Sequence, residues 1–110
     1  MKKAFGDLFD QLELVEADLS DKESLMKACE GASYIIHTAS PVTMEKPKHE
    51  NDVIKPAVDG TLSVMEAAKA NKAKHVVITS SLASVWATKD KKRFEFSSED
   101  WSDLTACTTY

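Results

Sequence analysis

Glycine is scarce in this sequence. The 110 residues contain three glycines, Gly6, Gly31 and Gly60, which are widely separated. A turn that binds a dinucleotide pyrophosphate needs closely spaced glycines, because backbone N–H groups must approach the phosphates. The chain therefore contains no glycine-rich phosphate loop.

Cysteine and histidine are also sparse. Cys29 and Cys107 lie far apart, and His37, His49 and His75 show no metal-ligand spacing. This usage predicts free thiols in a reducing compartment, no metal site and a cytoplasmic protein.

A basic excess and long apolar runs are missing as well. The chain has 14 basic and 18 acidic residues, a net charge of −4, and one basic cluster at 89–93 that we interpret as a solvated loop. This balance argues against a nucleic-acid partner. The N-terminus is interrupted by Gly6 and Asp7, so it does not resemble a signal peptide, and no apolar run is long enough to span a membrane. The length allows one small domain at most.

Three short apolar runs are present. They are rich in β-branched or aromatic residues and are continuous rather than alternating, which predicts parallel strands buried on both faces. The runs occupy residues 12–17, 33–39 and 75–80.

Helical patterns separate these runs. The first covers residues 20–31, with Ser20 and Glu23 as a capping box and Gly31 as the stop signal. The second ends near Asn71 and is expected to begin near residue 55, with Pro56 in its first turn. Gly60 falls inside this second helix and suggests close packing against a neighbour, the alternative being a glycine that the helix simply tolerates.

Strands that alternate with helices predict an α/β fold with a parallel sheet. Ligands of such sheets bind beyond the carboxyl ends of the strands. Here the three runs are followed by the polar segments EADLS, HTASP and TSSLAS. A nucleotide is therefore expected to lie across these segments.

The motifs VEADLSD, YIIHTASPV, ENDVIKPAVDGTLSVMEAAKA, HVVITSS and EDWSD occur in this order. Together they resemble the dihydroflavonol reductase, cinnamoyl-CoA reductase and aldehyde reductase branch of the extended short-chain dehydrogenases, over residues 12–110. The resemblance implies a partial Rossmann-like, doubly wound parallel sheet, an NADP or NAD cofactor with NADP favoured, and a small-molecule carbonyl substrate.

The resemblance also implies roles for individual residues. Hydride transfer to a carbonyl carbon leaves an alkoxide that a hydroxyl group can protonate or stabilise. Ser81 resembles the catalytic serine of the family and Tyr110 its catalytic tyrosine, with Ser80 as the alternative serine. The positions that resemble cofactor-binding residues are Asp18, Leu19, Thr38, Ala39, Ser40 and Ser80.

The sequence departs from the family pattern at both ends. The first two strands and their glycine turn are not found, nor are the substrate domain and the lysine that follows the family's tyrosine. We therefore expect residues 1–110 to be the middle segment of an NAD(P)-binding domain, a fragment that is inactive by itself.

Simpler interpretations stay open for several residues. Ser80 and Ser81 can cap a turn, Asp18 can bind turn amides, and Thr38 and Ser40 can cap the turn before Pro41. Tyr110 can be an ordinary terminal aromatic residue, and Trp86 can pack a loop. Two other functions remain: an inactive remnant that associates with itself or a relative through exposed strand edges, and an epimerase or dehydratase.

Overall fold

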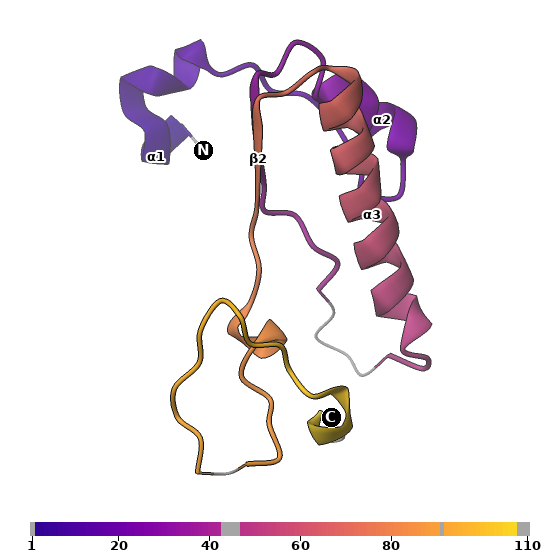
Figure 1. Cartoon of the computed structure of the whole chain (residues 1–110). Coiled ribbons are helices and arrows are strands. Elements are labelled where there is room, and N and C mark those ends of the chain that lie inside the picture. Colours follow the sequence, from indigo (N-terminus) through magenta and orange to yellow (C-terminus); the bar gives the residue numbers. More distant parts are fainter. Residues whose placement is uncertain (1, 43–46, 91, 108–110) are drawn as a thin grey trace.

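The computed structural model describes residues 2–42, 47–90 and 92–107. Its elements follow one another from a short N-terminal helical segment to a C-terminal loop region (Figure 1). In order they are α1 (Lys2–Phe5), the 3-10 helix η1 (Gly6–Gln11), α2 (Lys22–Ala28), β1 (Tyr34–His37), α3 (Asn51–Ala70), β2 (His75–Ile78) and the 3-10 helices η2 (Leu82–Ser84) and η3 (Leu104–Ala106).

The two strands form a parallel pair. Their register runs from Tyr34 opposite His75 to His37 opposite Ile78. The long helix α3 makes the crossover between them and lies beside the sheet (Figure 1). The predicted α/β class and the strands expected within 33–39 and 75–80 are thereby confirmed.

The strand predicted over residues 12–17 is wrong. Leu12 has extended dihedral angles, φ −87° and ψ 130°, but this segment has no strand assignment and pairs with no strand of the described chain. An extended segment becomes a strand only when a neighbour satisfies its N–H and C=O groups. The apolar side chains of this segment remain in solvent, as the 59% exposure of Leu14 illustrates.

The prediction that the strands are buried on both faces is also wrong. Tyr34, Ile36 and Val77 point to one face of the sheet, with exposed fractions of 64%, 73% and 58%. The opposite face is partly covered, because His37 there is only 7% exposed whereas Ile78 is 44% exposed. The continuous apolar sequence is thus suited to burial on both faces, but only one face is covered in the described chain, and that one incompletely. We call the residues Tyr34, Ile36, His75 and Val77 the open face.

The N-cap of helix α2 lies one residue later than expected. Asp21, not Ser20, is the N-cap, and its carboxylate accepts the Glu23 and Ser24 N–H groups at 3.0 and 3.2 Å. The Ser20–Glu23 capping box was therefore wrong, because the Ser20 side chain bonds to Asp18 instead. Gly31 follows the helix with φ +74°, the left-handed conformation expected of a glycine stop.

Helix α3 is longer than predicted. It starts at Asn51 and contains Pro56 in its interior, whereas the sequence placed Pro56 in the first turn. A proline inside a helix lacks the N–H that would bond four residues back. The prediction that Gly60 packs closely is confirmed, since a Cβ there would lie 3.1 Å from Leu19 Cδ2. The end near Asn71 is also confirmed, with Asn71 as the C-cap.

The hydrophobic core is small. It consists of apolar side chains from α2 and α3 that are less than 9% exposed, namely Leu25, Val64, Ala67 and Ala68. The accessible surface is 9735 Å², whereas a compact monomer of this mass exposes about 6000 Å². The radius of gyration is 17.4 Å, against about 13 Å for a compact domain of this length. Much apolar surface therefore remains uncovered.

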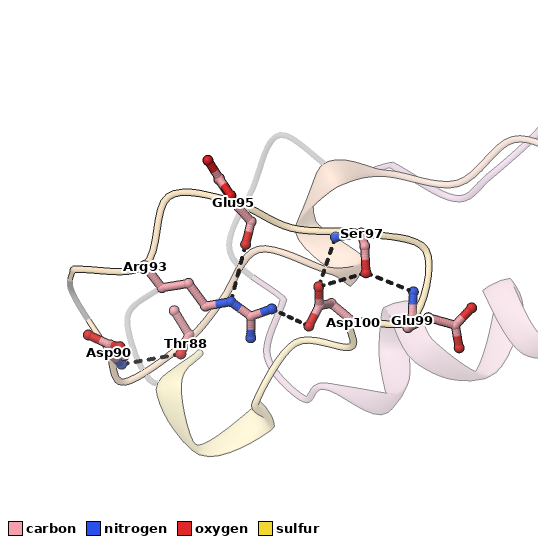
Figure 2. Close-up of polar contacts among 7 residues, drawn as sticks. All are labelled: Thr88, Asp90, Arg93, Glu95, Ser97, Glu99 and Asp100. Carbon is pink, nitrogen blue, oxygen red and sulfur yellow. Dashed lines mark hydrogen bonds and ion pairs between the residues drawn. The ribbon is translucent and has the colours of Figure 1, made fainter.

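Residues 79–90 and 92–107 form a region of loops and two short 3-10 helices beyond the carboxyl end of β2 (Figure 1). Arg93 links two parts of this region, since its guanidinium binds the Asp100 carboxylate and the Glu95 carbonyl oxygen (Figure 2). Ser97 caps the turn at 97–100, because its Oγ accepts the Glu99 N–H at 3.2 Å. The described residues of the basic cluster at 89–93 lie in a loop, as predicted.

Candidate functional site

The carboxyl ends of β1 and β2 bring two predicted segments together. The Thr79 N–H donates to the His37 carbonyl oxygen at 2.9 Å, which extends the parallel pairing past the strand ends. The segments 38–40 and 80–81 therefore leave the sheet at the same edge. Thr38, Ala39, Ser40, Ser80 and Ser81 are all exposed there.

Ser81 acts as the N-cap of η2. Its Oγ accepts the Ala83 N–H at 3.2 Å, so the simpler interpretation of this serine as a turn cap is correct in structural terms. The cap uses the oxygen only as an acceptor. No acceptor for the Ser81 hydroxyl proton is found among the described residues, and this proton can be donated to a ligand.

Ser80 differs from Ser81 in this respect. Ser84 Oγ donates its proton to the Ser81 carbonyl oxygen at 2.6 Å. Ser84 Oγ also lies 3.1 Å from Ser80 Oγ. Because a hydroxyl group has one proton, Ser80 must be the donor in that second bond. The Ser80 proton is thus engaged by Ser84, whereas the Ser81 proton is available.

Asp18 lies in a tight turn before α2. Its Oδ1 accepts the Ser20 N–H at 2.7 Å and the Ser20 hydroxyl at 2.5 Å. The bond from the Ser20 hydroxyl, followed by that from the Ser20 N–H, lowers the pKa of Asp18. The Asp18 N–H donates to Ser24 Oγ at 3.0 Å. The turn-binding role is therefore realised, while Oδ2 has no partner among the described residues and can accept an external N–H.

A shallow depression adjoins Asp18. It has a volume of about 460 Å³ and is lined by Glu16, Ala17, Asp18, Asp21, Ser24 and Lys27. Leu19 has a structural contact instead, because its side chain and carbonyl oxygen lie against Gly60 of α3. The contact with α3 makes Leu19 a packing residue, whatever else its backbone binds.

Two aromatic residues were also considered in the sequence analysis. Tyr110, the predicted catalytic tyrosine, falls outside the described residues. Trp86 is 62% exposed, so it does not pack the interior of the loop region as a buried residue would.

Sequence reasoning missed two serines that organise the Ser81 turn. Ser84 could have been found, because it follows Ser81 by three residues and a hydroxyl at that spacing commonly bonds back to a turn carbonyl. Ser102 gave no local signal. Its Oγ donates to the Ala83 carbonyl oxygen at 2.7 Å and accepts the Ala87 N–H at 3.0 Å, which are contacts between distant parts of the sequence.

Residues 5–108 match the 3-beta hydroxysteroid dehydrogenase/isomerase family. The match covers nearly the whole chain. The chain belongs to this family. Its curated relatives include a dihydroflavonol 4-reductase of Hordeum vulgare, 37% identical over 89% of this chain and 28% of the relative, and one of Solanum lycopersicum, 42% identical over 84% and 24%. A cinnamoyl-CoA reductase 1 of Arabidopsis thaliana is 40% identical over 89% of the chain and 28% of the relative.

These findings confirm the resemblance to the dihydroflavonol reductase and cinnamoyl-CoA reductase branch. The chain spans about a quarter of the length of these relatives, from 24% to 28%. Within the part of the chain that the structure describes, no helix is both long and apolar enough to cross a membrane. The same residues contain no group of three acidic, histidine or cysteine side chains placed to hold a metal ion.

Proposed function

We propose that this chain is a partial NAD(P)-binding domain of a carbonyl reductase that acts on ketones or aldehydes. In this proposal Ser81 donates a hydrogen bond to the carbonyl oxygen of the substrate. The observation that carries the assignment is the free hydroxyl proton of Ser81, next to a Ser80 whose proton is engaged by Ser84. A proton donor at this position stabilises the negative charge that develops on the oxygen during reduction.

The polar groups near Asp18 fit the adenine end of a nicotinamide dinucleotide. The free Oδ2 of Asp18 can accept an N–H of the adenine amino group, and Asp18 lines the adjoining depression. Asp18 is an ionised acceptor at neutral pH, as an ordinary aspartate is, and its lowered pKa extends this state to more acidic solutions. When bound, the nicotinamide ring supplies the hydride.

Thr38, Ala39 and Ser40 extend this binding region. They lie beside Ser80 and Ser81 at the carboxyl edge of the sheet, the usual place for a ligand in an open α/β sheet. Their exposed backbone and hydroxyl groups are suited to the ribose and pyrophosphate. A preference for NADP over NAD, and Tyr110 as the proton relay with a lysine outside this chain, are further parts of the proposal.

We further propose that residues 1–110 form an incomplete domain that is inactive by itself. Two properties support this: the excess accessible surface of 9735 Å² and the absence of closely spaced glycines for the pyrophosphate. Without those backbone donors, we expect NADPH to bind with a dissociation constant of about 1 mM or weaker.

A fluorescence titration with NADPH and an absorbance assay of its oxidation test these statements together. We expect weak, saturable binding and no oxidation with a panel of ketones and aldehydes. Sustained oxidation that depends on a carbonyl compound would contradict the proposed inactivity. A complete lack of binding at about ten times the expected constant of 1 mM would contradict the cofactor assignment.

The open face favours a second function, association with a second copy of this chain. Tyr34, Ile36 and Val77 are more than half exposed, and His75 stacks on Tyr34 with ring centroids 5.8 Å apart. The open face carries no carboxylate or ammonium group, so two copies can meet without charge repulsion. The unpaired outer edges of the two-stranded sheet offer additional backbone donors and acceptors.

Light scattering after size-exclusion chromatography tests this association. We expect a dimer for the unmodified chain and a monomer for Ile36→Lys, which places a charge in the middle of the open face. Val42→Lys is the matched control, since Val42 is 82% exposed but lies outside the sheet. A monomeric unmodified chain, or a dimer that survives Ile36→Lys, would contradict the second function.

A further inference from the structure

We propose that Ser102 is a positioning residue that sets the orientation of the Ser81 hydroxyl through Ala83. The inference rests on the proposed function for its relevance to carbonyl reduction. It adds a residue that lies outside the turn and makes no contact with the proposed ligand.

Ala83 is held from both sides. Its N–H donates to Ser81 Oγ at 3.2 Å, and its carbonyl oxygen accepts the Ser102 hydroxyl at 2.7 Å. The two bonds involve the peptide groups that flank one Cα atom. Together they restrict both backbone dihedral angles of Ala83, and loss of the bond to Ser102 removes one of the two restraints on the residue whose N–H orients Ser81.

Ser102 is itself fixed on the other side of the turn. Its Oγ accepts the Ala87 N–H at 3.0 Å, and its own N–H donates to the Ser84 carbonyl oxygen at 2.9 Å. The next residue continues the contact, because the Asp103 N–H donates to the Ala87 carbonyl oxygen at 2.8 Å. Ser102 thus clamps the chain before and after Val85, and its side chain is only partly exposed.

The clamp has a direct consequence for the proposed chemistry. Ser81 is exposed at the end of the sheet, where a free hydroxyl would rotate among several orientations. The bond from the Ala83 N–H occupies one lone pair of Ser81 and so limits the orientations that its single proton can take. A hydroxyl that is already oriented loses less freedom when it binds a carbonyl oxygen.

Amide hydrogen exchange and chemical shifts of the ¹⁵N-labelled 110-residue chain test the inference. Ser102→Ala removes the acceptor of the Ala87 N–H and the donor to Ala83. We expect exchange at Ala87 to accelerate about fivefold, the effect of one lost hydrogen bond, together with a shift change and faster exchange at Ala83. Ser102→Thr keeps the hydroxyl and is expected to restore both signals. Ser98→Ala is the control, because no side-chain hydrogen bond of Ser98 is found in the described chain.

An unchanged Ala83 signal in Ser102→Ala, with the β1 and β2 amides intact, would overturn the inference. So would a failure of Ser102→Thr to restore it. Ser81→Ala provides a second test, because it leaves the hydrogen bonds of Ser102 in place. If Ser102 links Ser81 to Ala87 through Ala83, the amide signals of both Ala83 and Ala87 change in this variant. A signal change confined to Ala83 would contradict the inference. NADPH binding is measured separately, so a chain that binds no NADPH but shows these couplings rejects the proposed function and not the role of Ser102.

Discussion

Leu19 lies directly against Gly60. A Cβ atom at Gly60 would be 3.1 Å from Leu19 Cδ2, 3.2 Å from Leu19 Cβ and 3.3 Å from the Leu19 carbonyl oxygen. The Cβ atom and the carbonyl oxygen of Leu19 cannot move without a shift of the backbone. This contact fixes the turn that carries Asp18 to the middle of α3.

Gly60→Val is therefore expected to destabilise the chain. The added branched side chain overpacks the contact with Leu19, which costs about 1–3 kcal/mol in free energy of unfolding. Leu62→Val is the matched control, because Leu62 lies on α3 with 54% exposure and loses only helix propensity. Urea denaturation followed by circular dichroism measures both. Equal stability of the two variants would show that the contact with Leu19 is loose.

The N-terminus of α2 gives a prediction that separates two adjacent residues. Asp21→Ala removes the side-chain acceptor of the Glu23 and Ser24 N–H groups and should cost about 1 kcal/mol. Ser20→Ala removes no cap and should leave the helix content unchanged. Denaturation curves of the two variants test this assignment, and a larger loss in Ser20→Ala would restore Ser20 as the cap.

Ser20→Ala should instead change the titration of Asp18. The Ser20 hydroxyl and N–H lower the pKa of Asp18, so removal of the hydroxyl raises that pKa toward its ordinary value. A carboxylate with a lowered pKa stabilises the folded chain above its unfolded pKa of about 3.9. This contribution is lost as the pH falls through the folded pKa. Carboxyl ¹³C shifts measured against pH report the change, and an unaltered Asp18 titration would contradict it.

Arg93→Ala is expected to loosen the loop at 88–100 without unfolding the chain. The guanidinium binds Asp100 and the Glu95 carbonyl oxygen (Figure 2). Its central carbon also lies 5.0 Å from the Phe96 ring centroid. An ion pair this exposed contributes at most about 1 kcal/mol. Faster amide exchange within the loop and unchanged exchange in β1 and β2 are the expected result. Lys92→Ala is the control. Equal acceleration of amide exchange in both variants would show that the loss of one positive charge, and not the specific contacts of Arg93, loosens the loop.

The sequence predicted the elements whose signals are local. The two strands and the stop at Gly31 depend on short runs of neighbouring residues, and the close approach at Gly60 followed from its place inside a helix. The cap of α2 was misplaced by one residue, because Ser20 and Asp21 are both good caps and only the folded turn engages Ser20 with Asp18.

Other features depend on contacts that no local pattern reveals. Residues 12–17 have the composition of a strand, but a strand also needs a neighbour, and the described chain supplies none. The choice between Ser80 and Ser81 rested on family resemblance, whereas the engagement of each proton depends on Ser84. Ser102 was missed because its partners lie 15 and 19 positions away in the sequence.

A residue-resolved titration of the ¹⁵N-labelled chain with NADP⁺ tests the proposed site most directly. We predict that the largest amide shift changes fall on Asp18, on residues 38–40 and on Ser80 and Ser81, while α3 and the loop at 88–100 change little. Shift changes spread evenly over the chain, or concentrated outside Asp18, residues 38–40, Ser80 and Ser81, would contradict the proposed site.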